Sequence, residues 1–276
     1  MIDLIQGETL EEMQKLVDKG IVVDMILADL PYGTTSNKWD AVIPFEPLWE
    51  LYWKILKPTG VIVLTASQPF TSALLMSQPQ HFKHEWIWIK NRGSNFANTV
   101  REPMKEHEQV LVFSKGKWTY NKQMQERTGA GADRVKYNVK FESKSDNYRE
   151  FEGRKENKLS DLRVPSTWQK FNTDTSKSHP TVKPIPLFEY MIRTYTNEGE
   201  TVLDNTMGSG TTALACMNLD RNFIGIELEE KYYEVAKKRV EEKRKEKGLT
   251  VGTAFEVDEY DGSESLRTLA DLVLVA

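Results

Sequence analysis

The chain has 276 residues, of which 39% are hydrophobic and 28% are charged, and its formal net charge is −4. This is the composition of an ordinary globular protein, and the length fits one large α/β domain with an insertion. No apolar run approaches the roughly 18–20 residues of a membrane span, and the first residues carry no secretory signal, so we expect no membrane contact. The single cysteine, Cys216, excludes an internal disulfide and a cysteine-cluster metal site and favours a reducing, cytoplasmic setting.

The charge is distributed unevenly along the chain. Residues 81–180 hold 20 basic and 13 acidic side chains, although the chain as a whole is acidic. A basic middle segment suits contact with nucleic-acid phosphates. It equally suits a solvated insertion whose lysines face water, and charge alone leaves both interpretations open.

Before residue 115 the chain alternates strand and helix patterns. Continuous apolar runs such as 21–28 are typical of buried parallel strands, and apolar residues at helical spacing over 8–18 predict an amphipathic helix. Residues 57–60 contain Pro and Gly and are expected to end the preceding helix. The predicted strands are 2–5, 21–28, 60–66, 84–90 and 109–114, and the predicted helices are 8–18, 47–56 and 69–77.

Residues 115–178 differ from the rest of the chain. They are polar, basic and irregular, but they contain too many aromatic residues for a plain linker. Aromatic residues among lysines and arginines suit a nucleic-acid surface, and they equally suit a small domain with its own core.

From residue 185 the α/β pattern returns. The predicted helices are 186–195, 211–219 and 229–247, and the predicted strands are 201–203 and 222–226. Both α/β stretches together predict one Rossmann-like, doubly wound, mostly parallel sheet with an irregular insertion. The expected divisions are a first half over 1–114, the insertion over 115–178, a second half over 179–250 and an acidic tail over 251–276.

A glycine turn at 204–212 lies between a predicted strand and a predicted helix. Gly208 and Gly210 allow a tight turn and a close approach of backbone to a ligand, and helix N-termini offer free N–H groups. A plain turn would explain the two glycines alone. The turn lacks the Gly-Lys-Ser/Thr of phosphate loops and the third glycine of dinucleotide sites, so a cofactor without a pyrophosphate fits better. Glu227, at the end of the next predicted strand, is placed to accept hydrogen bonds from ribose hydroxyls.

The segment Asp29-Leu30-Pro31-Tyr32-Gly33 follows a buried strand. Its Asp, Pro and Gly could simply form a turn, but the segment lies at the sheet edge where ligands bind in such folds. It resembles the D-P-P-Y signature of DNA amino-methyltransferases, with Leu30 in place of the first Pro. Further segments that resemble this family are the glycine loop at 204–212, the H-P-T-x-K-P segment at 179–184, the strand at 106–113 and the G-D segment at 6–8, with Glu8 in place of Asp.

The order of these motifs resembles that of the β arrangement of N6-adenine and N4-cytosine DNA methyltransferases. The resemblance covers about residues 1–245 and implies S-adenosyl-L-methionine as cofactor, double-stranded DNA as partner, no metal, and a plausible homodimer. It also implies that the Asp29 carboxylate and the Leu30 carbonyl accept the N–H hydrogens of a flipped-out base. Tyr32 would stack on that base, and Pro31 would shape the loop. The resemblance also implies that residues 1–114 form the catalytic half, residues 115–178 the target-recognition insertion and residues 179–250 the cofactor-binding half.

The resemblance further implies a set of cofactor contacts. Asp204 would lie near the methionine amino group, Glu227 would hold the ribose, and Glu8 would approach the adenine moiety. His179, Thr181 and Lys183 would lie near the methionine carboxylate or the loop beneath it. The full expected set is Glu8, Asp29, His179, Thr181, Lys183, Asp204, Thr206, Met207, Gly208, Gly210, Thr211 and Glu227.

Several functions remain open from the sequence. Asp29 at the first loop position favours adenine, because the family tends to place Ser there for N4-cytosine methylation. Methylation of a protein glutamine uses a similar loop, but in those enzymes the cofactor loop precedes the catalytic loop. A DNA-binding relic without turnover is the non-enzymatic alternative. Cys216 lies in a predicted helix remote from any C5-cytosine motif.

Overall fold

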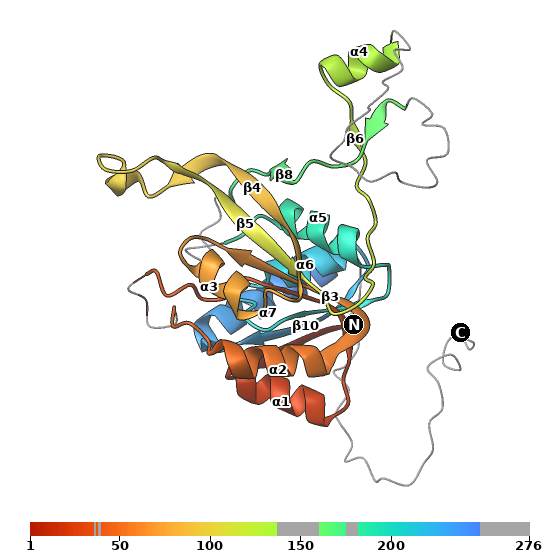
Figure 1. Cartoon of the computed structure of the whole chain (residues 1–276). Coiled ribbons are helices and arrows are strands. Elements are labelled where there is room, and N and C mark those ends of the chain that lie inside the picture. Colours follow the sequence, from red (N-terminus) through yellow and green to blue (C-terminus); the bar gives the residue numbers. More distant parts are fainter. Residues whose placement is uncertain (36, 38–39, 137–159, 175–181, 249–276) are drawn as a thin grey trace, which may run out of the picture.

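The computed structural model describes the whole chain except residues 36, 38–39, 137–159, 175–181 and 249–276 (Figure 1). An eight-stranded sheet has the order β1-β10-β9-β2-β3-β5-β4-β8. β5 is antiparallel to both of its neighbours, and the other neighbouring strands are parallel. The strands are β1 (Ile2–Gln6), β2 (Val23–Ala28), β3 (Leu56–Ala66), β4 (Phe82–Ser94), β5 (Lys105–Phe113), β8 (Trp168–Lys170), β9 (Thr201–Asp204) and β10 (Asn222–Glu227).

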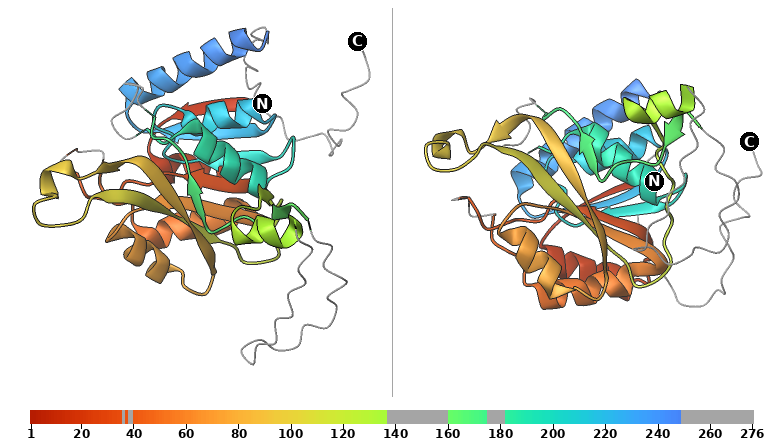
Figure 2. Two further views of the ribbon diagram at one scale, coloured as in Figure 1. Left: turned by 90° about the horizontal axis from the view of Figure 1, so that it is seen from above. Right: turned by 45° about the horizontal axis from the view of Figure 1, so that its top comes forward.

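Helices cover both faces of this sheet (Figures 1 and 2). Successive side chains of a strand point to opposite faces, and β2 follows this rule. Met25 and Leu27 pack with α5 (Ile185–Tyr195), α6 (Thr211–Asn218) and α7 (Glu230–Glu246). Ile26 and Ala28 pack on the other face with α1 (Thr9–Asp18), α2 (Phe45–Ile55) and α3 (Phe70–Ser77). Two apolar layers therefore enclose the sheet, and the predicted doubly wound, mostly parallel fold is confirmed.

β2 and β9 join the two halves of the chain, because they pair directly at the centre of the sheet. The carboxyl ends of β2, β9 and β10 consequently meet at one edge. Ligands bind at this edge in doubly wound sheets.

The structure corrects two predicted boundaries. Residues 57–60 do not simply stop a helix, since they lie within β3, which begins directly after α2. β4 and β5 extend beyond the predicted 84–90 and 109–114 and form a long hairpin. The polar composition of residues 91–104 hid this extension, because no apolar alternation marks a hairpin that leaves the sheet.

The expected insertion contains short elements in its described part. They are β6 (Gln125–Glu126), α4 (Ala130–Lys136) and β7 (Leu162–Arg163), together with β8, which joins the edge of the large sheet. β6 and β7 pair as a separate two-stranded sheet. The acidic tail at 251–276 lies outside the described residues.

Candidate active site

A cavity of about 700 Å³ opens at the carboxyl ends of β2, β9 and β10. Most of the predicted site residues line it. They are Glu8, Asp29, Leu30, Pro31, Tyr32, Lys183, Asp204, Thr206, Met207, Gly208, Thr211 and Glu227. Gly210 instead packs against α7, and His179 and Thr181 lie outside the described residues.

The Asp29 carboxylate is held by three donors. Its Oδ1 accepts hydrogen bonds from the hydroxyls of Tyr32, at 2.8 Å, and Thr65. Its Oδ2 accepts from Lys183 Nζ at 2.6 Å. The Asp29 side chain is 23% exposed, whereas that of Lys183 is 8% exposed. The carboxylate is therefore fixed from behind while part of it faces the cavity.

Lys183 lies between two acidic side chains. Its Nζ also lies 3.5 Å from Glu108 Oε2, and Glu108 pairs in turn with Lys90 on the neighbouring strand β4. Burial alone would lower the pKa of Lys183, but the charges of Asp29 and Glu108 outweigh burial and raise that pKa above its ordinary value. The ammonium thus stays charged and balances the acids around residues 29–33, the predicted catalytic loop.

Tyr32 packs against the core side of the cavity. Its ring stacks on Phe70, with centroids 5.1 Å apart and an interplanar angle of 25°, and Lys183 Nζ lies 5.5 Å from the ring centroid. Burial and the charge of Asp29 raise the pKa of the Tyr32 hydroxyl well above its ordinary value, so it remains a donor. One ring face is covered by Phe70.

Asp40 shapes the chain that follows the catalytic loop. Its carboxylate accepts hydrogen bonds from the backbone N–H groups of Gly33, Thr34 and Thr35, at 2.6–2.9 Å. Burial alone would raise the pKa of Asp40, but these hydrogen bonds outweigh burial and lower that pKa. The buried carboxylate therefore holds the loop closed at the rim of the cavity.

Glu227 organises the glycine loop. Its Oε2 accepts from the backbone N–H of Gly208 and its Oε1 from that of Glu229, each at 2.8 Å. Burial raises the pKa of this carboxyl. Each oxygen keeps a further lone pair, which suits the ribose contact predicted from the sequence.

Asp204 is a buried carboxyl beside that loop. It accepts from the Thr206 N–H at 3.1 Å and from the Thr212 hydroxyl. Burial raises its pKa to about 7. No basic side chain pairs with it in the part of the chain that the structure describes. A ligand cation would stabilise the charged form, so the site fits an ammonium group.

Asn205, the residue after Asp204, is fully buried. Its Oδ1 accepts from the Tyr52 hydroxyl and its carbonyl from the Thr9 hydroxyl, both at 2.6 Å. Its buried Nδ2 has no hydrogen-bond partner among the described residues. The atom is enclosed by protein, so it does not face the cavity as a ready donor. Next in the chain, the Thr206 hydroxyl donates to the Asp29 carbonyl at 3.1 Å and ties the glycine loop to the catalytic loop.

Two predicted residues also have structural roles. Glu8 caps α1 by accepting from the Glu11 N–H at 2.9 Å. Gly210 has a φ of +80°, and a Cβ there would lie 2.9 Å from the Ala236 Cβ. Gly210 is thus required for backbone conformation and for packing on α7, and it does not line the cavity.

Sequence reasoning missed several side chains of the site. The notable ones are Thr65 at the end of β3, Glu108 and Lys90 on β5 and β4, and Asn205. A signal existed for Glu108, since it is a charge at the start of an apolar strand. Thr65 and Lys90 carry no such signal, because only the register of β3, β4 and β5 brings them to the loop.

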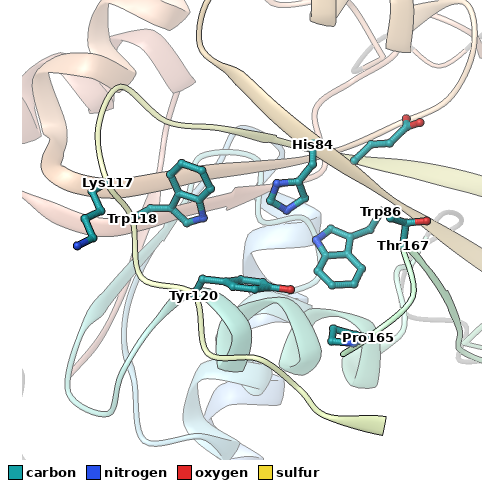
Figure 3. A pocket seen from close by; sticks show the side chains of 8 residues that line it. His84, Trp86, Lys117, Trp118, Tyr120, Pro165 and Thr167 are labelled. Atoms are coloured by element: carbon teal, nitrogen blue, oxygen red, sulfur yellow. The ribbon is translucent and has the colours of Figure 1, made fainter. Parts of the chain in front are cut away.

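A second cavity, of about 470 Å³, lies toward the start of β4 (Figure 3). Its lining is mainly aromatic and comprises His84, Glu85, Trp86, Lys117, Trp118, Tyr120, Pro165 and Thr167. His84 Nε2 lies 2.6 Å from the Tyr195 hydroxyl, which also accepts from Trp86 Nε1. Burial lowers the pKa of His84. None of the predicted catalytic or cofactor residues lines this cavity.

Within the described ranges, no group of three or more His, Cys, Asp and Glu side chains is arranged to hold a metal ion. The helices described there are also too short or too polar to cross a membrane.

The chain is similar to known methyltransferases. The profile of an N6/N4 methyltransferase family described as DNA methylase matches residues 23–238. The type II methyltransferase M.HpaI of Haemophilus parainfluenzae is 28% identical over 257 residues, which are 86% of this chain and 74% of that protein. The crystal structure of an M1.HpyAVI–SAM complex is 28% identical with a TM-score of 0.60, covering 87% of this chain and 100% of that one. The PvuII cytosine-N4-specific DNA methyltransferase, 16% identical with a TM-score of 0.59 and 86% coverage of both chains, shares the fold.

Proposed function

Because the chain belongs to the N6/N4 family of DNA methylases, we propose that it methylates N6 of an adenine flipped out of double-stranded DNA at a specific site. The observation that carries this proposal is the Asp29 carboxylate at the cavity. Its Oδ2 accepts one described hydrogen bond, from Lys183, and so retains a lone pair for an amino N–H.

The amino nitrogen of adenine is a weak nucleophile, because its lone pair is conjugated with the ring. Acceptors for its N–H groups let the nitrogen turn that lone pair toward a methyl donor. Asp29 supplies one acceptor and the carbonyl of Leu30 the other. The Leu30 side chain is 3% exposed and packs in the core, so the backbone is what this position offers to the cavity. Positive charge that develops on nitrogen strengthens both hydrogen bonds, and this stabilises the transition state. As the N–C bond forms, the methyl group's bond to sulfur breaks, and the nitrogen would then lose one amino proton along its hydrogen bond to Asp29.

The cofactor of this family is S-adenosyl-L-methionine, which supplies an electrophilic methyl group on a sulfonium. The residues present fit it. Asp204 would hold the methionine ammonium and Glu227 the ribose hydroxyls. The bond from Thr206 to the Asp29 carbonyl fixes the two loops relative to each other, which is the positioning that such a transfer requires.

Adenine is favoured over cytosine by the carboxylate at position 29, because the family tends to have Ser there for N4-cytosine. The flipped base would stack on the face of Tyr32 that Phe70 leaves uncovered. A fold shared with a cytosine-N4 enzyme keeps N4-cytosine methylation as the alternative.

The test is to incubate the protein with unmethylated DNA and labelled S-adenosyl-L-methionine, digest the DNA and identify the modified nucleoside. N6-methyl-2′-deoxyadenosine supports the proposal, and sequencing the modified positions gives the target site. N4-methylcytosine would overturn the choice of base. The control is Asp29→Ala, which should abolish transfer while leaving cofactor binding measurable by calorimetry. Retained turnover in this variant would refute the proposed role of Asp29.

A further inference from the structure

The hairpin formed by β4 and β5 projects past the catalytic edge of the sheet (Figures 1 and 2). Ser94 and Lys105, which pair across the hairpin, line the same cavity as Asp29. The hairpin tip, residues 95–104, therefore begins directly at the rim of the proposed active site. Any duplex that delivers a base to Asp29 must pass close to it.

The tip is locally well ordered by polar contacts. Asn95 has a φ of +61°, its side-chain oxygen accepts from the Lys105 N–H at 2.9 Å, and its Nδ2 donates to Glu102 at 2.9 Å. A short 3-10 helix, η1 (Phe96–Asn98), follows. These bonds brace the turn without using its apolar side chains.

Those apolar side chains are turned outward. Phe96 is 80% exposed and Val100 is 86% exposed. Exposed large apolar groups gathered on one structured tip are a feature of contact surfaces. Single exposed apolar residues are common elsewhere on proteins, but here two lie four residues apart beside a reactive cavity.

The charges around the tip identify the partner. Arg92, Arg101 and Lys105 lie along residues 91–105, where Glu102 is the one acidic residue and is bonded to Asn95. Basic side chains flanking an apolar point suit a polyanion with an apolar interior. Duplex DNA is such a partner, because phosphates line its outside and stacked bases its inside.

We propose that the hairpin tip inserts Phe96 and Val100 into the duplex at the place that the flipped adenine leaves. This inference rests on the proposed function and names the element that opens the DNA. Apolar wedges of this kind compensate for lost stacking in proteins that kink or unstack DNA. Phe96 occupies the gap, Val100 contacts the neighbouring base pair, and the arginines hold the adjacent phosphates.

The experiment measures single-turnover methylation of two synthetic duplexes that carry the site found by sequencing. In one duplex the target adenine is paired with thymine, and in the other it faces an abasic position, so less pairing has to be broken. The test variant is Phe96→Ala/Val100→Ala. The matched control is Val22→Ala, an exposed apolar residue at the opposite end of β2 from Asp29.

The double variant should methylate the paired duplex about tenfold or more slowly than wild type and the abasic duplex within about threefold of wild type. A variant with Phe96→Leu alone should keep most of the wild-type rate on the paired duplex, because leucine is still a large apolar side chain. Val22→Ala should match wild type on both duplexes. Equal losses on the two duplexes, or no loss on either, would overturn the wedge. If the double variant differs from wild type in oligomeric state by size-exclusion chromatography, the wedge is also overturned, because the tip would then form an interface between copies of the chain. Failure of the proposed function is seen separately and earlier, because a labelling experiment that yields no methylated adenine refutes that function and gives no site from which to build the duplexes.

Discussion

Lys183 is the counter-charge on which the catalytic loop depends, and Lys183→Met tests this. The substitution keeps the apolar stem of the side chain but removes a charge 2.6 Å from Asp29 and 3.5 Å from Glu108. Loss of one partner from a buried ion pair typically costs about 3–5 kcal/mol, because the other charge is left uncompensated. Asp29 keeps the Tyr32 and Thr65 donors and Glu108 keeps Lys90, so we expect the lower end of that range, about 3 kcal/mol.

The assay is urea unfolding followed by tryptophan fluorescence at pH 7.5. Lys54→Met is the control, because it breaks an exposed pair with Glu50 and should change the unfolding free energy by no more than about 0.5 kcal/mol. Asp29→Asn added to Lys183→Met should recover part of the loss, since Asp29 is the acid left without a cation while Glu108 keeps Lys90. A loss for Lys183→Met of less than about 1 kcal/mol would refute the buried counter-charge.

The pH dependence gives an independent check on Lys183. Its pKa is raised in the folded protein, so the wild-type pair contributes full stability below the unfolded pKa of about 10.4, and this contribution is lost as pH rises through the folded pKa. In Lys183→Met this contribution is absent at every pH. The stability difference between wild type and variant should therefore shrink as pH rises from about 9 through the folded pKa of Lys183, and a constant difference over that range would contradict the mechanism.

Three further predictions follow from the cavity and its surroundings. The pKa of Asp204 is raised to about 7 by burial, so binding of S-adenosyl-L-methionine should tighten as pH rises from 6 to 8, and in calorimetry Asp204→Asn should remove that dependence. Gly210→Ala should lower the unfolding free energy by about 2–4 kcal/mol, because it combines a strained φ with a clash at Ala236; Gly199→Ala, with a φ of +78° in open space, should cost about 1–2 kcal/mol. DNA affinity, measured by fluorescence anisotropy from 50 to 200 mM salt, should fall steeply if residues 81–180 contact phosphates; a flat response would place the DNA contact elsewhere.

Most of the sheet could be predicted because its strands are continuous apolar runs. Residues 21–28 and 60–66 are hydrophobic on both faces, as parallel strands covered by two helix layers must be. The hairpin beyond residue 90 was missed for the converse reason. It leaves the sheet, gains no burial, and so shows no alternation, although its bonds around Asn95 hold it in a defined shape.

The candidate site also contains some residues that could be predicted from the sequence and some contacts that could not. Asp29, Asp204 and Glu227 were predictable because each ends or follows a strand at one edge of the sheet, where chain order alone brings them together. The contacts that Lys183 makes with Asp29 and Glu108 were not predictable, because they depend on side-chain reach and on the register of β5.

Glu108 meets Lys183 only because β5 runs antiparallel beside β3 and its first residues return to the catalytic edge. A strand pattern specifies neither the direction of a neighbour nor its register, so the charge balance of the site is a tertiary property. In the proposed mechanism the motif residues offer acceptors to a substrate, and Thr65 on β3 and Glu108 on β5 complete the contacts that hold Asp29 and Lys183 in place. A sequence can therefore share the motif with this family and still lack activity if it lacks the counter-charges, so Lys183 and Glu108 should be examined together with Asp29 in any related chain.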